Sequence, residues 1–343
     1  MNYFNYLDHD EYHFDVVTHK MESTVYADEI TAAGGHVYLF TPARLGTMKV
    51  NARRFSEILD AGHYDIVHCH MANAAFIYLK IAQQKGVPIR ILHSHQDHYA
   101  DTKLHALRNI PLISIGKRYA NRRVACSKES GRFLFGSKSF TVVNNGIDLD
   151  TFHFDTRKRI EQRAKLDLQN SDLLLGQVGR LVPQKNPIFS IHVFNELYRR
   201  HPNARLVFAG DGELREEMEQ LVHQLGIGER IQFLGNITDV TKLYSALDAL
   251  LMPSLYEGIS LSMAEAQGMG LPVFAANTIA EESFATSFAV RLNLGDGPET
   301  WAEAILQTLP KMPKKRDSGI AQMRQHGFDA KECAQIIQAI YDS

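Results

Sequence analysis

Short apolar runs alternate with helical patterns twice along this chain, and this rhythm restricts its fold more than any other feature. Runs of strand length lie at residues 14–18, 36–40, 66–69, 90–93, 123–126 and 140–143, and again at 173–178, 205–209, 231–233, 249–252, 273–275 and 289–292. Amphipathic stretches separate them. The alternation is typical of βαβ units, so we expect an α/β protein with parallel sheets.

A polar stretch at residues 150–172 divides the two series. We expect an N-terminal Rossmann-like domain over 1–155, a second over 156–325, and a C-terminal segment over 326–343 whose helix lies at 330–341. Two doubly wound domains would bind a ligand in the cleft at the carboxyl ends of their strands.

Composition excludes several protein classes. The chain has 343 residues, 45% of them hydrophobic, and no apolar run near the roughly 18 residues that a membrane span needs. We see no secretory signal at its start. Its three scattered cysteines predict reduced thiols and a cytoplasmic protein. A net charge of −2 gives no reason to expect a nucleic-acid partner.

Charge is nevertheless uneven. Residues 103–132 carry eight Lys or Arg side chains interleaved with apolar residues. Such a segment could rest on an anionic membrane surface, or it could be a solvated helix face.

Two cations stand where a strand passes into a helix. Arg180 and Lys185 follow the apolar run at 173–178, and Pro187 is a normal first residue of a helix. Fixed cations at this position suit a diphosphate, which needs charge-assisted donors. The alternative is a surface loop that is incidentally basic.

Two carboxylates surround a glycine-led helix start further on. Glu257 and Gly258 precede the helical pattern, and Glu265 lies within it. Free backbone amides at such a start can bind phosphate, and carboxylates can accept hydrogen bonds from sugar hydroxyls. A carboxylate pair could also serve a glycosidase, but the spacing and the cationic loop fit nucleotide binding better. Gly210 and Gly212 follow another strand and permit close backbone approach, which is weak evidence by itself.

Histidines gather at the ends of two strands in the first half. Alternation puts His68 and His70 on one face of their strand, and His93 and His95 on one face of the next. Adjacent parallel strands would bring these ends together. A zinc site and a metallohydrolase are therefore an alternative, with Asp97 and Asp101 as nearby acids.

A tight turn closes the first series. Asn145 and Gly146 form an Asn-Gly pair that tolerates positive φ, and Asp148 follows. Ser127 is expected to cap the helix after the run at 123–126.

The motif Glu257-x7-Glu265, together with Arg180 and Lys185, resembles the donor half of GT-B glycosyltransferases of the large retaining family 4, of the exopolysaccharide or capsule type. The resemblance extends over residues 15–341, and it implies that the C-terminal helix packs back on the N-terminal domain. It implies a GT-B fold and transfer of a sugar from a nucleotide-sugar, UDP-linked, to a glycan or lipid-linked acceptor. It implies no metal ion and no cofactor, since the nucleotide-sugar is a substrate.

The resemblance also implies residue roles. His95 and Glu257 would hold the reacting sugar. The donor would be bound by Arg180, Lys185, Gly210, Gly212, Ile237, Gly258, Ile259, Ser260, Leu261 and Glu265. The cleft and hinge would be shaped by His70, Asn145, Gly146 and Asp148, whereas His68 and His93 would be structural.

Relatives begin with a strand and a Gly-rich loop that we do not find here, because the first glycine is Gly34. We therefore expect an incomplete first domain, and a nucleotide-binding relic without transferase activity is a further alternative. The resemblance otherwise predicts a cytoplasmic enzyme that is peripheral at the inner face of the membrane.

Overall fold

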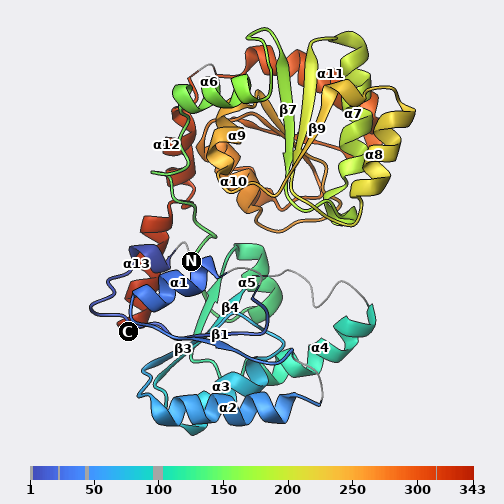
Figure 1. The fold of residues 1–343 in the computed structure, drawn as a ribbon. Coiled ribbons are helices and arrows are strands. Elements are labelled where there is room, and N and C mark those ends of the chain that lie inside the picture. The colour runs from blue at the N-terminus through green and yellow to red at the C-terminus, as the bar shows by residue number, and fades with distance from the viewer. Residues whose placement is uncertain (1–2, 22–23, 43–45, 96–102, 314) are drawn as a thin grey trace. The chain divides into compact units, whose positions relative to one another are not determined.

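The computed structural model describes residues 3–21, 24–42, 46–95, 103–313 and 315–343. They form two compact units, drawn in Figure 1. Unit 1 comprises residues 1–146 and 330–343, and unit 2 comprises residues 147–329. Asp97, Asp101 and His98 lie outside the described residues.

Unit 1 contains only parallel strand pairs among its described residues. Two strands, β1 (Val16–Thr18) and β2 (Val37–Leu39), pair with each other. Four more form a separate sheet in the order β3 (Ile66–Cys69), β4 (Ile89–Ser94), β5 (Arg122–Ala125) and β6 (Thr141–Val142). Among the described residues, β1 and β3 belong to two separate sheets.

The α-helices among the described residues of this unit are α1 (Val25–Ala32), α2 (Met48–Ala61), α3 (Ala75–Gln84), α4 (Lys103–Gly116), α5 (Lys128–Phe135) and α13 (Ala330–Tyr341). Helix α13 returns to the sheet from the far end of the chain. Its residues Cys333 and Ile337 pack in one buried cluster with Ile91 of β4 and Val124 of β5. Ser127 caps α5 through a capping box, as expected.

Unit 2 is a six-stranded parallel sheet. Its order is β12 (Ala289–Leu292), β11 (Val273–Ala276), β10 (Ala249–Met252), β7 (Leu173–Val178), β8 (Ala204–Ala209) and β9 (Ile231–Gly235). The chain runs outward from β7 to β9 and then crosses to β10 on the other side of β7. The strand order therefore reverses between β7 and β10, where ligands bind in open α/β sheets.

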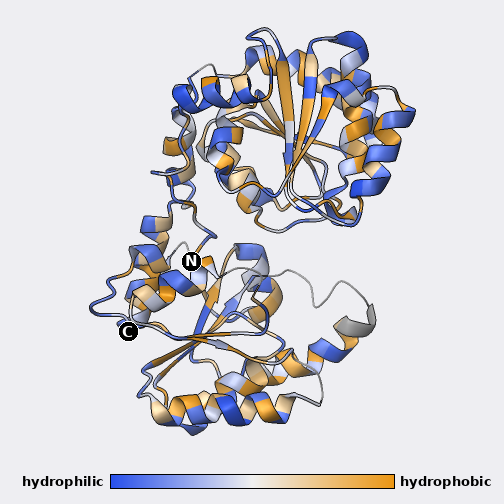
Figure 2. Ribbon diagram, viewed as in Figure 1, coloured by the Kyte–Doolittle hydropathy of each residue, from blue (hydrophilic) through white to orange (hydrophobic). Residues whose placement is uncertain are grey.

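Helices cover both faces of this sheet, namely α6 (Thr156–Lys165), α7 (Pro187–Arg200), α8 (Arg215–Gln224), α9 (Val240–Ala246), α10 (Leu261–Gly268), α11 (Gly297–Thr308) and α12 (Ser318–Gln325). One buried cluster joins the sheet to α7, α8 and α11, and a second joins it to α9 and α10. Figure 2 shows the strands between them in hydrophobic colours. These strands are apolar on both faces because both faces are covered.

The polar stretch at 150–172 is not a bare linker, because it contains α6. Arg159 and Arg163 of this helix both pair with Asp248, at 2.6 and 3.2 Å. Arg163 also donates to the carbonyl of Asp172 at 2.7 Å. Ion pairs and carbonyl contacts, more than apolar burial, hold this helix on unit 2.

The basic segment at 103–132 does not form one helix face. The interpretation of the whole segment as a solvated helix face was therefore wrong. It comprises α4, β5 and the start of α5. Lys117 donates to the carbonyl of Leu134 at 2.8 Å, and Arg122 donates to Ser343. No helix among the described residues has both the length and the apolar character that crossing a bilayer requires.

Candidate active site

The loop after β7 carries the two expected cations. Gly179 adopts φ 137°, Arg180 is exposed, and a short 3-10 turn ends at Lys185. Gln177, at the end of the apolar strand, donates from Nε2 to the carbonyl of Lys185 at 2.8 Å. Asn186 then takes a left-handed conformation, with φ 50°, directly before α7. The turn thus fixes the backbone from which both cations extend.

The loop after β10 meets this turn. The Lys185 ammonium donates to the Glu257 carboxylate, and the two side chains are only 15% and 12% exposed. Ser254 Oγ donates to the other oxygen of Glu257 at 2.9 Å. By contrast, no hydrogen bond or ion pair of the Arg180 guanidinium occurs among the described residues. One cation is therefore held by a carboxylate, and the other remains available.

Glycines let the neighbouring loops approach each other closely. A Cβ on Gly210 would lie 2.0 Å from the carbonyl oxygen of Gly179, and one on Gly212 would lie 2.3 Å from that of Leu181. The amide of Gly210 also donates to the carbonyl of Gly235 at 2.8 Å. The carboxyl ends of β7, β8 and β9 are thereby drawn together. Ile237, two residues past β9, packs against the buried cluster on the α9 and α10 side.

Helix α10 begins as the sequence predicts. Ser260 is its N-cap residue and is 3% exposed, but its side chain makes no cap hydrogen bond. The first amides of a helix have no partner within it, so those after Ser260 can bind an anion. Ile259 is partly buried and Leu261 is 44% exposed. Gly258 is anchored through its carbonyl, which accepts from Ser283 Oγ at 3.1 Å.

Glu265 lies inside α10 and away from the cationic turn. The Tyr244 hydroxyl donates to its Oε2 at 3.1 Å. Burial raises the pKa of Glu265 to about 7, although the bond from Tyr244 opposes this shift. The two glutamates of the motif consequently differ in environment: Glu257 is paired with a cation, whereas Glu265 is bonded to a neutral phenol.

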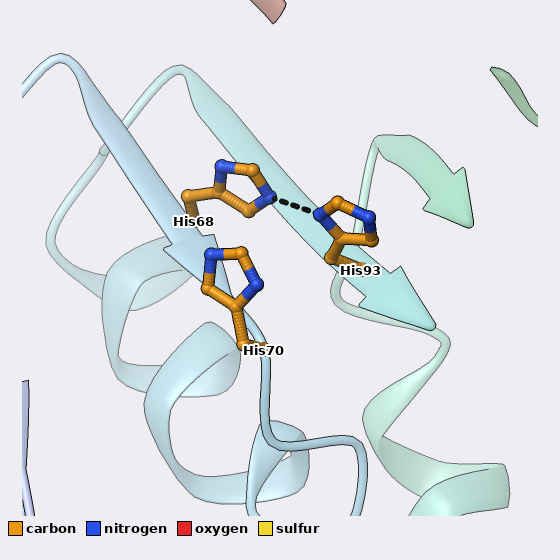
Figure 3. Close-up of side chains that lie close together, drawn as sticks. All are labelled: His68, His70 and His93. Atoms are coloured by element: carbon orange, nitrogen blue, oxygen red, sulfur yellow. Dashed lines mark hydrogen bonds between the residues drawn. The ribbon is translucent and has the colours of Figure 1, made fainter. Parts of the chain in front are cut away.

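His68, His70, His93 and His95 meet at the ends of β3 and β4, as alternation predicts. His68 Nε2 lies 3.1 Å from His93 Nδ1, and His70 Nδ1 lies 2.8 Å from His95 Nε2. The rings of His93 and His95 stack with centroids 4.2 Å apart. Figure 3 shows three of these rings converging from the two strands.

Burial keeps these rings neutral. It holds the pKa of His68 and of His93 well below the usual value, and repulsion between neighbouring rings adds to the effect. Burial also lowers the pKa of His95, while a hydrogen bond with Asn145 acts in the opposite direction. His70, His95 and Asn145 are thus connected within unit 1.

The Asn-Gly turn differs from the expectation. Neither Asn145 nor Gly146 has positive φ among the described residues. Glycine is needed at 146 for space instead, because a Cβ there would lie 2.8 Å from the Cα of Ala330. Asp148 accepts hydrogen bonds from the amides of Asp150 and Thr151, so its carboxylate caps a local turn.

Three residues around the carboxylates were missed. Ser254 donates a hydrogen bond to Glu257, and Tyr244 donates one to Glu265. Gln177 donates one to the backbone carbonyl of Lys185. Gln177 did carry a signal, since it is a polar residue at the end of an otherwise apolar run. Ser254 and Tyr244 gave none, because their contacts depend on packing.

Two protein-family models together match most of the chain. Residues 2–151 match the model described as Glycosyltransferase Family 4, and residues 158–325 match Glycosyl transferases group 1. The putative glycosyltransferase EpsF of Bacillus subtilis is 29% identical over 360 residues, which span 100% of this chain and 91% of that protein. An Escherichia coli protein named UDP-Gal:alpha-D-GlcNAc-diphosphoundecaprenol alpha-1,3-galactosyltransferase is 26% identical over 231 residues, 64% of this chain and 60% of that protein.

Solved structures give the fold. HepE of Anabaena in complex with UDP-glucose superposes with a TM-score of 0.78 at 19% identity, covering 96% of this chain and 91% of that one. The lipopolysaccharide glycosyltransferase WaaG superposes with a TM-score of 0.67 at 16% identity, covering 97% and 92%. Together with the two parallel sheets and the donor motif, these matches identify the chain as a GT-B glycosyltransferase that belongs to family 4, the glycosyl transferases group 1.

Proposed function

We propose that the protein transfers a sugar from a UDP-sugar to a glycan or lipid-linked acceptor in polysaccharide synthesis. The observation that carries this proposal is the Lys185–Glu257 pair beside the start of α10, at the point where the strand order of unit 2 reverses. This is where a cation, a carboxylate and free helix amides can each meet one part of a nucleotide-sugar. The solved structures of HepE in complex with UDP and with UDP-glucose support the choice of donor.

The leaving group is a nucleoside diphosphate, whose developing charge must be stabilised. Arg180 and Lys185 supply cations, and the amides that follow Ser260 supply neutral donors. Preorganised donors of this kind lower the barrier because they need no rearrangement as charge develops. Gly210 and Gly212 let their loop lie against the loop that carries the cations, and Glu265 accepts hydrogen bonds from the ribose hydroxyls.

The reaction retains the anomeric configuration of the sugar. The acceptor oxygen forms a bond to the anomeric carbon on the face from which the diphosphate oxygen departs. That departing oxygen takes the proton of the acceptor hydroxyl, so no separate base is needed. Glu257 and His95 hold the sugar in place, and His70 and Asn145 support His95. Because cations and amides meet the diphosphate, no divalent metal is required.

The acceptor assignment rests on the relatives. The Escherichia coli relative is named for a diphosphoundecaprenol acceptor, a lipid that lies in a membrane. We infer that this protein works as a peripheral enzyme at the cytoplasmic face, with exposed apolar side chains of α4, such as Leu107, toward the lipid.

UDP release from a panel of UDP-sugars, in the presence of membranes that contain lipid-linked glycans, tests the proposal. Wild-type protein should release UDP, and Lys185→Ala should not. Lys165→Ala, which removes an exposed cation on α6 of the same unit, serves as the control. Equal rates for all three proteins would reject the donor site.

The histidine cluster favours one alternative, a metallohydrolase. A two-metal hydrolase needs carboxylate ligands, and the two acids considered for this role, Asp97 and Asp101, lie outside the described residues. If EDTA abolishes the release of UDP and Zn²⁺ restores it, the metallohydrolase interpretation is correct. We expect turnover to persist in EDTA.

A further inference from the structure

Three imidazoles of unit 1 converge on one point. His68 lies on β3, His70 follows the end of that strand, and His93 lies on β4. One nitrogen from each lies within 4.8 Å of the other two. Figure 3 shows the three rings side by side. The nitrogens of His68 and His93 are 3.1 Å apart. Two nitrogens bound to the same tetrahedral zinc ion, each about 2.05 Å from it, are separated by about 3.3 Å, so little movement is needed.

Hydrogen bonding alone leaves this cluster incomplete. His93 is fully buried, and its Nε2 has no hydrogen-bond partner among the described residues. Its Nδ1 faces His68. Whichever way the single proton of each neutral ring is placed, one nitrogen of His93 remains buried without a partner. A metal ion between the inward-facing nitrogens would bind Nδ1 of His93, and the single proton of this ring would then lie on Nε2.

Outer contacts orient two of the rings. The hydroxyl of Tyr341, on α13, lies 2.9 Å from His68 Nδ1, which leaves His68 Nε2 facing the cluster. His95 Nε2 lies 2.8 Å from His70 Nδ1. Histidines that bind metals are usually held in this manner, through a hydrogen bond at the nitrogen that is not coordinated.

We propose that His68, His70 and His93 form a binding site for one divalent metal ion that prefers nitrogen ligands, with Zn²⁺ as the first candidate. Imidazole suits zinc, copper and nickel, whereas Mg²⁺ and Ca²⁺ need oxygen ligands that these three residues do not supply. His70 is exposed, so solvent can provide a fourth ligand. The site lies within unit 1, and binding of a metal ion there does not depend on the proposed function.

Titration of the metal-free protein with Zn²⁺ alone, in competition with a chromophoric chelator, tests the site. We expect one equivalent to bind. His68→Gln and His93→Gln should each weaken binding at least about 100-fold, and His63→Gln, which changes an exposed histidine of the same unit, should leave it unchanged. Co²⁺ should give the visible bands of a tetrahedral ion bound by nitrogen. Absence of stoichiometric binding, or thiolate-to-cobalt bands that indicate a buried cysteine, would overturn the proposal.

A second pair of variants keeps the test valid if His93→Gln fails to fold. Tyr341→Phe removes the hydroxyl beside His68 and retains the ring. Loss of such an outer contact typically costs about 10- to 100-fold in metal affinity, and we expect a loss in this range. Tyr12→Phe is the matched control, because its hydroxyl contacts Asp342 and no imidazole. Equal Zn²⁺ affinity in Tyr341→Phe, His68→Gln and wild type would contradict the assignment.

Discussion

Lys185 and Glu257, which are 72 residues apart in the chain, form an ion pair that is largely shielded from solvent. The Glu257 carboxylate is therefore paired with the Lys185 ammonium before any diphosphate binds. A nucleotide-sugar must compete with this carboxylate for the ammonium. Removing one partner of such a pair leaves the other charge without compensation. Substitutions of Lys185 and of Glu257 should consequently have different effects on UDP affinity.

Glu257→Gln should separate binding from transfer. It releases Lys185 from its carboxylate, so UDP affinity should stay equal or rise. Transfer should fall about 100-fold or more, because Glu257 no longer holds the sugar. Calorimetry with UDP measures the affinity, and a steady-state assay measures the rate of transfer. Parallel loss of both would mean that Glu257 serves only to position Lys185.

Gly210→Ala should destabilise unit 2 far more than Gly226→Ala. Both glycines have positive φ, 135° and 67°. A Cβ at 210 would also lie 2.0 Å from a carbonyl oxygen, whereas nothing lies within 4 Å of one at 226. We expect losses of about 2–5 kcal/mol at 210 and about 1–2 kcal/mol at 226, measured by urea denaturation. Equal losses would show that the loops after β7 and β8 can separate at little cost.

Glu265→Gln should change how stability depends on pH. The pKa of Glu265 is raised to about 7 from an ordinary value of 4.5, so the folded state holds its proton more tightly than the unfolded state. The resulting stabilisation is complete below pH 4.5 and is lost as the pH rises toward 7. Between these values wild type should lose up to about 1.4 kcal/mol per pH unit relative to Glu265→Gln. If the free energy of unfolding depends on pH in the same way for both proteins, the pKa of Glu265 is not raised in the folded state.

The strand pattern was readable from the sequence, but side-chain partners were not. Apolar runs predicted β7, β10 and β12 with their observed bounds. Helix α6 was missed because its contacts are ion pairs to Asp248, which leave no apolar stripe. The convergence of the histidines followed from strand alternation. The return of the last helix was also expected, but the contact of Tyr341 with His68, 273 residues apart, was not, because it depends on side-chain packing.

The same limit applies to the donor site. The motif indicated Lys185 and Glu257 as functional residues. Their direct pairing depends on β10 lying beside β7, and this strand order reverses the order of the chain. Periodicity reports which residues face inward, but it does not report which strands are neighbours.

The structure narrows the membrane prediction to α4. Leu107, Ile110 and Ile115 are exposed on this helix, and the exposed cations nearby are Arg108 in the helix and Arg118 just after it. Each cation near anionic lipid contributes about 1 kcal/mol, so reversing Arg108 and Arg118 to Glu should lower binding to anionic vesicles at least about tenfold. The control reverses Arg157 and Lys165, two exposed cations of α6. Equal sedimentation of both variants at low salt would show that α4 is a solvated face.

The central claim is that the β7 and β10 loops of unit 2 bind the diphosphate of a nucleotide-sugar. Calorimetric titration of UDP into wild type, Arg180→Ala, Lys185→Ala and the control Lys165→Ala tests it most directly. A charge-assisted contact contributes about 1.5–3 kcal/mol, so the first two substitutions should each weaken binding roughly 10- to 150-fold. Lys165→Ala should match wild type. Unchanged UDP affinity in both Arg180→Ala and Lys185→Ala would contradict the account.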